Sequence, residues 1–163
     1  MSVRSRNAQW NLRLVRAMME SVEVVSGAVG AGIAFKEYAD AKRTGVLTLT
    51  RSNQITKLVF SLLGLAGSTF SLVEYARPVR RLTFFQTRST PIAYLTVASV
   101  IEAGFLLSVL VSIVGIVNPA KLPSGGVLAQ AIFFLIGGAL PVYPLIADSR
   151  QLNIMRPYRY QPV

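Results

Sequence analysis

The sequence predicts an all-α integral membrane protein with four transmembrane helices and short connections between them. Hydrophobic residues make up 52% of the 163 residues and charged residues only 15%, whereas ordinary soluble domains contain about 25% charged residues. The mean hydropathy is +0.49. The apolar residues gather in stretches of roughly 20 residues or more, the length that a helix needs to cross a hydrocarbon core ~30 Å thick. We therefore expect a single membrane domain over residues 1–163.

The four expected spans lie at about residues 17–35, 58–76, 91–117 and 127–147. The first is the least apolar, because it contains Glu20 and Glu23, whereas the fourth contains no charged residue. A soluble four-helix bundle is disfavoured, because its helices need a polar face and the second and fourth stretches show apolar or small residues all round. Pro141 and Pro144 lie inside the fourth stretch and predict a kink there, because proline cannot donate the helical hydrogen bond.

The segments outside the spans have compositions of their own. Residues 1–16 contain four arginines and no acid, which is typical of an organelle-targeting segment and equally of a basic amphipathic arm lying on anionic lipid. The connection from Lys36 to Lys57 contains an alternating run, Val46–Thr50, which predicts a short hairpin or a surface segment. Residues 148–163, rich in Pro, Tyr and Arg, are expected to form an extended tail that docks along another protein.

The chain is strongly basic, with 17 Lys and Arg against 7 Asp and Glu and a formal net charge of +10. This balance favours an anionic partner. Nucleic acid is excluded, because the basic residues are divided among membrane-flanking stretches rather than gathered on one surface. Their distribution predicts that both termini lie on the more basic, matrix or stromal side of the membrane. The run with Arg77, Arg80 and Arg81 is expected to contact an anionic lipid such as cardiolipin, or to act as a positive anchor that fixes the topology.

Small residues recur at helical spacing inside the apolar stretches. Most of the twelve glycines lie there, although an interior glycine costs a soluble helix about 1 kcal/mol. Small residues four apart allow membrane helices to approach closely. We therefore expect these positions to pack against other helices, with a glycine-lined pore as the alternative. They are Gly27, Gly30 and Ala34 in the first stretch, Gly64 and Ser68 in the second, and Gly104, Ser108 and Ser112 in the third.

Glutamates within the apolar stretches are the candidate functional residues. Glu20 and Glu23 share a helical face with the glycines of the first stretch, opposite a row of valines. A charge at mid-membrane costs about 2.5–3.5 kcal/mol, so each acid should have a partner. Arg16, one turn away, is the expected partner of Glu20, whereas Glu23 has no base nearby. Glu102 lies deep in the third stretch, on a different face from its small residues. That helix is therefore expected to be central in the bundle or to be covered by a second protein.

Two interpretations of these acids remain open. They form interhelical hydrogen bonds or ion pairs to an Arg or Lys of a partner chain, or Glu20, Glu23 and Glu102 form a proton or cation relay. The chain contains no Cys and no His, which excludes disulfides and thiol or imidazole catalysis. We expect no enzymatic activity and no catalytic, cofactor-binding or metal site. A structural phospholipid is the only ligand we expect, and the sequence contains no family motif.

The first functional hypothesis is a non-catalytic accessory subunit of a multi-subunit, energy-converting membrane complex. A respiratory-chain complex or ATP synthase of the mitochondrial inner membrane fits the arginine-rich start, with the thylakoid membrane as the second choice. The partners would be other membrane subunits and anionic phospholipids, without a small-molecule substrate. The alternative is a small proton- or cation-coupled carrier or channel that uses Glu102 and Glu23.

Overall fold

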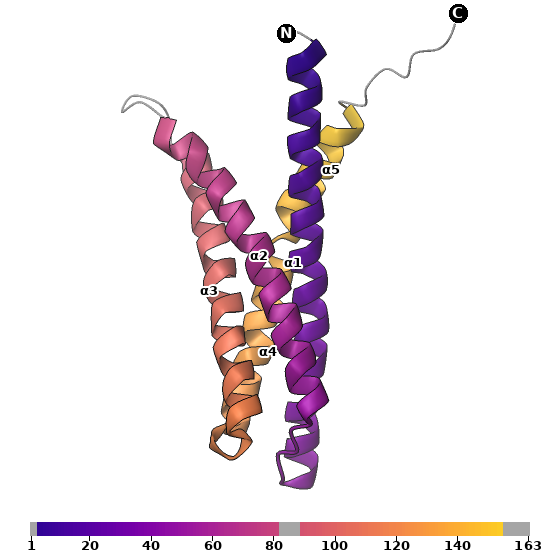
Figure 1. The fold of residues 1–163 in the computed structure, drawn as a ribbon, viewed down its shortest axis with the longest axis vertical. Coiled ribbons are helices and arrows are strands. Elements are labelled where there is room, and N and C mark those ends of the chain that lie inside the picture. The colour runs from indigo at the N-terminus through magenta and orange to yellow at the C-terminus, as the bar shows by residue number, and fades with distance from the viewer. Residues whose placement is uncertain (1–2, 82–88, 155–163) are drawn as a thin grey trace, which may run out of the picture.

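The structure is all-helical across the part that it describes. This computed structural model describes residues 3–81 and 89–154, with side-chain environments for residues 9–76 and 92–154 (Figure 1). Within those residues there is no strand, so the all-α prediction is confirmed. The elements are α1 (Val3–Thr44), α2 (Arg51–Arg81), α3 (Ser89–Val117), the 3₁₀ turn η1 (Pro119–Lys121), α4 (Ser124–Ala139) and α5 (Val142–Ile154).

Four helical segments are long and apolar enough to cross a membrane, as the sequence predicts. They are Gln9–Thr44, Arg51–Ala76, Ile92–Val117 and Ser124–Ile154. The last of these contains both α4 and α5, which are separated at Leu140 and Pro141. Helical hydrogen bonds continue on both sides of this break, because the Leu140 amide donates to Ile136 at 3.1 Å and the Leu145 amide donates to Pro141 at 3.0 Å.

The first helix is much longer than the predicted span. It contains 42 residues, or about 63 Å at 1.5 Å per residue, and it includes most of the expected N-terminal arm. The residues after Phe35 are good helix formers, and nothing in them stops the helix before Gly45. Gly45 has a φ of 73°, and its amide donates to the carbonyl of Ala41 at 2.9 Å. A left-handed glycine just past the last turn is a common helix end.

The structure decides between two alternatives for one segment outside the spans and corrects the expectation for another. The segment after α1 is short and forms no hairpin. It is a surface segment, the other alternative, with Val46, Thr48 and Thr50 exposed. Leu47 and Leu49 pack against a buried apolar cluster formed by Ala34, Leu122, Val127 and Ala131. The C-terminal tail was expected to be extended from residue 148, but α5 continues to Ile154. No proline or glycine lies between residues 148 and 154 to end that helix. The rest of the expected tail lies outside the described residues.

The helices form two units that meet at one end of the molecule. Helix α1 contacts α2, α4 and α5, and α3 contacts both α2 and α4. Figure 1 shows α2 and α3 side by side as an antiparallel pair that leans away from α1 and α5 at the end where the described chain begins and finishes. We call this the splayed end, and we call the other end, where the two units converge, the closed end. The third helix thus has protein from its own chain on two faces.

The close approach of the helices depends on the small residues that the sequence singled out. In the middle of the bundle, the ring of Phe105 lies over Gly64 and Gly137. The ring of Phe134 covers Gly30 and meets Phe105 edge-on, with the ring centroids 6.3 Å apart. The backbone of α1 at Gly27 lies directly against that of α4. Ala34, Ser68, Gly104, Ser108 and Ser112 are also buried between helices of this chain.

This packing makes a matched pair of substitutions informative. A side chain at Gly27 would overlap the backbone of Gly138, whereas a Cβ at Gly32 meets no described atom within 4 Å. We expect Gly27→Val to destabilise the protein by about 1–3 kcal/mol through overpacking, and Gly32→Val in the same helix to have little effect. Thermal unfolding in detergent measures the difference, and equal midpoints for the two variants would contradict the packing described.

Candidate functional site

The interior of the bundle contains a row of polar and small residues on one face of α2. They recur every three or four residues, and all but the half-buried Tyr75 are buried. We call this row the polar stripe of α2: Gln54, Lys57, Ser61, Gly64, Ser68, Ser71 and Tyr75. A repeat of this kind keeps one side of a helix against its neighbours. Within the expected span 58–76 the stripe consists of small residues and Tyr75, whereas Gln54 and Lys57 lie in α2 before that span.

Towards the splayed end, the stripe meets the glutamates of α1. Glu20 and Glu23 are each only 1% exposed. The Tyr75 hydroxyl donates to Glu20 Oε1 at 3.0 Å, and the Ser71 hydroxyl donates to Glu23 Oε1 at 2.8 Å. The two glutamates of the predicted face are therefore turned toward α2, whereas Gly27 and Gly30 of the same face pack against α4. Both carboxylates obtain a hydrogen bond from their own chain.

Glu102 of α3 also bonds to α2. The Ser68 hydroxyl donates to Glu102 Oε2 at 2.5 Å, and the Thr69 hydroxyl donates to Glu102 Oε1 at 2.9 Å. We call Glu20, Glu23 and Glu102 with their hydroxyl donors the acidic cluster. The opposite face of α3, which carries the small residues, is turned toward α4, where Gln130 donates to the Ser108 carbonyl at 3.0 Å. Both faces of α3 are thus covered by this chain.

The expected ion pair between Arg16 and Glu20 is not formed in the described part of the chain. Arg16 Nε instead lies 3.1 Å from Asp148 Oδ2, while its Nη2 donates to the Tyr75 hydroxyl at 3.0 Å. Tyr75 stands between the two groups, because its hydroxyl accepts from Arg16 and donates to Glu20. Glu20 Oε2 is buried without a hydrogen-bond partner among the described residues.

Asp148 is a buried acid of the candidate site that sequence reasoning missed. Its side chain is only 5% exposed, and its Oδ1 accepts from Arg13 Nη1 at 3.0 Å. The pairing with Arg13 and Arg16 ties α5 to α1. The sequence carried a signal for it, since Asp148 is the only acid after Glu102 and the two arginines are one turn apart on α1.

Towards the closed end, the stripe contains a lysine that is fully buried. Lys57 Nζ donates to Glu37 Oε2 at 2.6 Å and to Gln130 Oε1 at 2.9 Å. Gln54 donates to both oxygens of Glu37, at 3.1 and 3.3 Å. Gln130 also donates to the Ser112 hydroxyl at 2.7 Å. We call these five residues the lysine cluster, and it joins α1, α2, α3 and α4.

An apolar layer separates the two clusters. Ala31, Ile101, Phe105 and Phe134 form one buried hydrophobic cluster. On α1, Ala31 lies between Glu23 and Glu37; on α3, Phe105 lies between Glu102 and Ser112. The bundle therefore has ionisable residues at two depths with an apolar layer between them. The sequence placed Glu37 and Lys57 in a connection, so this second depth was missed.

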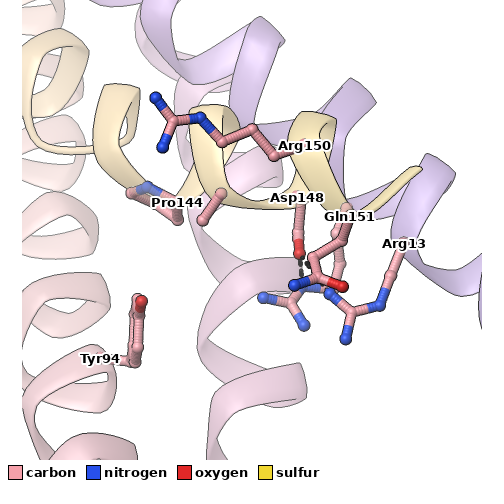
Figure 2. Close-up of a pocket in the computed structure, with 8 residues that line it drawn as sticks. Arg13, Tyr94, Pro144, Asp148, Arg150 and Gln151 are labelled. Carbon is pink, nitrogen blue, oxygen red and sulfur yellow. Dashed lines mark hydrogen bonds and ion pairs between the residues drawn. The ribbon is translucent and has the colours of Figure 1, made fainter. Parts of the chain in front are cut away.

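The splayed end contains a recess of about 400 Å³, shown in Figure 2. Asp148 faces Arg13 there, and Tyr94 approaches from α3. The recess is lined by Arg13, Arg16, Tyr94, Pro144, Ala147, Asp148, Arg150 and Gln151. A second void of about 10 Å³, close to the size that one water needs, lies beneath it beside Glu20 and Glu23 and shares Tyr94 and Pro144 with the recess.

Comparisons with known proteins identify no relative. No family model, no curated protein and no solved structure matches this chain. The functional argument therefore depends on the geometry of the site.

The sequence raises two questions about ligands, one about anionic lipid and one about metal ions. The side chains of Arg77, Arg80 and Arg81, expected to contact anionic lipid, lie outside the described residues. Among the described residues, no group of three or more His, Cys, Asp or Glu side chains could hold a metal ion.

The lysine cluster can be tested by breaking one half of the ion pair. We expect Lys57→Met to lower the stability by about 3–5 kcal/mol, because Glu37 would remain as a buried charge without its cation. Combining Lys57→Met with Glu37→Gln removes that charge and should restore most of the loss. Thermal unfolding in detergent is the measurement, with Lys36→Met at an exposed position of α1 as the control. A Lys57→Met midpoint equal to that of the control would contradict the role assigned to the pair.

Proposed function

We propose that this chain is an integral membrane protein that works as a small proton- or cation-coupled carrier using Glu23 and Glu102. Membrane insertion is supported by the distribution of side chains. The interior contains polar and charged residues, while large apolar residues such as Leu62, Leu110 and Leu135 are exposed on the outer faces. An apolar exterior around a partly polar core suits a hydrocarbon solvent.

One observation supports the carrier above all others: Glu23 and Glu102 bond to hydroxyl groups and not to bases. A serine or threonine hydroxyl can donate to a carboxylate and can accept from a carboxylic acid. Each acid therefore keeps a hydrogen-bond partner whether it is protonated or charged. No Lys or Arg forms an ion pair with either acid in the part that is described. Intramembrane acids placed in this way are functional candidates.

The two ends of the bundle fit such a carrier. At the splayed end, the recess and the small void lead toward the acidic cluster. At the closed end, the lysine cluster joins α1, α2, α3 and α4. A second recess of about 400 Å³ lies at that end, lined in part by Ala41, Leu47 and Leu122. We propose that access alternates when the α2–α3 pair moves relative to α1, and that Pro141 and Pro144 form the kink that lets α5 move relative to α4.

The proposed membrane is inferred from the composition of the first residues. We propose the mitochondrial inner membrane first and the thylakoid membrane second, because of the arginine-rich start. The described chain starts and ends at the same end of the bundle (Figure 1). We propose the matrix or stromal side for that end, because more of the basic residues flank it.

The carrier is tested in liposomes that contain the purified protein. We expect a sodium or potassium gradient to drive a pH change inside the vesicles, read with an enclosed pH-sensitive dye. Glu102→Gln and Glu23→Gln should each reduce the rate at least tenfold, because an amide cannot exchange a proton. Asp40→Asn is the control, since Asp40 is exposed near the end of α1 and pairs only with Arg43. Vesicles no faster than protein-free ones, or full activity in both Gln variants, would refute the carrier.

The second candidate is the non-catalytic accessory subunit of a respiratory-chain or ATP synthase complex. One feature favours it, namely the length of α1. A helix of about 63 Å is roughly twice the thickness of the hydrocarbon core, so α1 extends well beyond the membrane. Its first half exposes Leu12, Val15 and Met18, an apolar face that a neighbouring subunit could cover.

Isolation from native membranes in mild detergent tests the accessory subunit. We expect the chain to migrate with other membrane subunits, and serine at Leu12, Val15 and Met18 together to release it while the isolated protein remains folded. Serine at Leu106, Leu107 and Leu110, exposed positions of α3, is the matched control. A native protein that migrates alone and drives cation-coupled proton flux would exclude the accessory subunit and leave the carrier.

A further inference from the structure

The recess at the splayed end has a strong excess of positive charge. Arg13, Arg16 and Arg150 line it, against the single acid Asp148. Arg150 is exposed and has no bonding partner among the described side chains. An arginine-lined cavity favours a ligand with a phosphate or carboxylate group, because the guanidinium fork matches both.

The bonds to Asp148 leave several N–H donors of Arg13 and Arg16 without a partner among the described residues. A guanidinium group has five N–H donors; the described bonds use Nη1 of Arg13, and Nε and Nη2 of Arg16. The side chains of Arg13 and Arg16 remain 35% and 23% exposed, while that of Asp148 is 5% exposed. Asp148 therefore lies behind the two arginines and fixes them with N–H groups to spare. A preorganised donor set lowers the entropy lost on binding.

One aromatic side chain, that of Tyr94, lines the recess from α3. The ring of Tyr94 stacks on Tyr75, with centroids 5.2 Å apart, and also on Tyr143 at 6.4 Å. The guanidinium carbon of Arg16 lies 4.8 Å from the centroid of the Tyr75 ring. The recess thus combines fixed cationic donors with a rigid apolar wall, which suits a ligand that has both an anionic group and an organic part.

Size and charge narrow the ligand class. A cavity of about 400 Å³ falls within the range of roughly 300–1,000 Å³ for small-molecule sites, so it has room for more than an inorganic ion. The lining carries two more positive than negative charges, which matches a phosphate monoester with close to two negative charges at neutral pH. We propose that the recess between α1, α3 and α5 binds an organic phosphate through Arg13, Arg16 and Arg150.

The phosphate can come from a soluble ester or from a phospholipid headgroup, and two experimental arms distinguish these sources. In the first, the full chain is placed in nanodiscs of phosphatidylcholine and titrated with glycerol 3-phosphate by calorimetry. In the second, the nanodiscs contain one part in five of phosphatidic acid, and the lipids retained by the protein are counted by native mass spectrometry. Saturable binding in either arm supports the site, and the arm that responds identifies the source.

The test variant is Arg13→Gln with Arg150→Gln, which leaves Arg16 to hold Asp148 and Tyr75. We expect it to weaken binding at least tenfold. The matched control, Lys36→Gln with Arg51→Gln, removes the same charge from exposed positions farther toward the closed end and should bind like the parent. If the double variant does not fold, Arg150→Gln alone should still weaken binding several-fold.

Three results would overturn the proposal. They are no binding to the parent protein in either arm, undiminished binding to the arginine variants, and equal weakening in the charge-matched control. The last would mean that the net charge of the whole protein, rather than the recess, attracts the phosphate. None of these results depends on transport, so the experiment tests the phosphate site independently of the proposed carrier function.

Discussion

The polar stripe of α2 must be covered by hydrogen-bonding partners, and the arrangement of the other helices satisfies this requirement. Lipid chains offer no hydrogen bonds, so an uncovered polar group in the membrane costs several kcal/mol. Helix α1 supplies Glu20, Glu23 and Glu37 to the stripe, α3 supplies Glu102, and α4 supplies Gln130. The stripe thus determines which face of each neighbour turns inward. Apolar packing alone would not, because membrane interiors provide little hydrophobic drive between helices.

The helical class and the number of apolar segments could be predicted because both depend on local composition. The same reasoning failed at the ends of the segments. Glu37 and Lys57 are charged, so a hydropathy argument assigned them to a connection, whereas the structure buries them as a pair. Burial of a charge depends on a partner that is distant in sequence, and here Gln130 comes from another helix. Only the spacing of polar residues along α2 carried a signal.

For the acids, the helical spacing predicted which face is buried, whereas the bonding partners depend on the tertiary structure. The helical spacing of Glu20, Glu23 and Gly27 correctly placed them on one buried face. It could not identify their partners, because Arg16 has a choice between Glu20, one turn away, and Asp148, 132 positions later. Asp148 prevails in the structure, with Tyr75 placed between Arg16 and Glu20. Glu20 and Glu23 are therefore buried within their own chain, whereas Glu102 remains half-buried.

The bonds between the two helical units suggest where motion would be controlled. Helix α1 has no proline and runs unbroken through both clusters, so it acts as a single body. The described side-chain bonds that join it to α2 pass through Glu20, Glu23, Glu37 or the Arg16–Tyr75 contact. Glu23 and Glu20 accept hydrogen bonds from hydroxyl groups, whereas Glu37 forms an ion pair with the ammonium group of Lys57. Protonation can therefore weaken the ion pair at the closed end strongly, while the hydroxyl bonds near the splayed end survive it. Under the proposed carrier, protonation would therefore affect the interface between the two units unequally along its length.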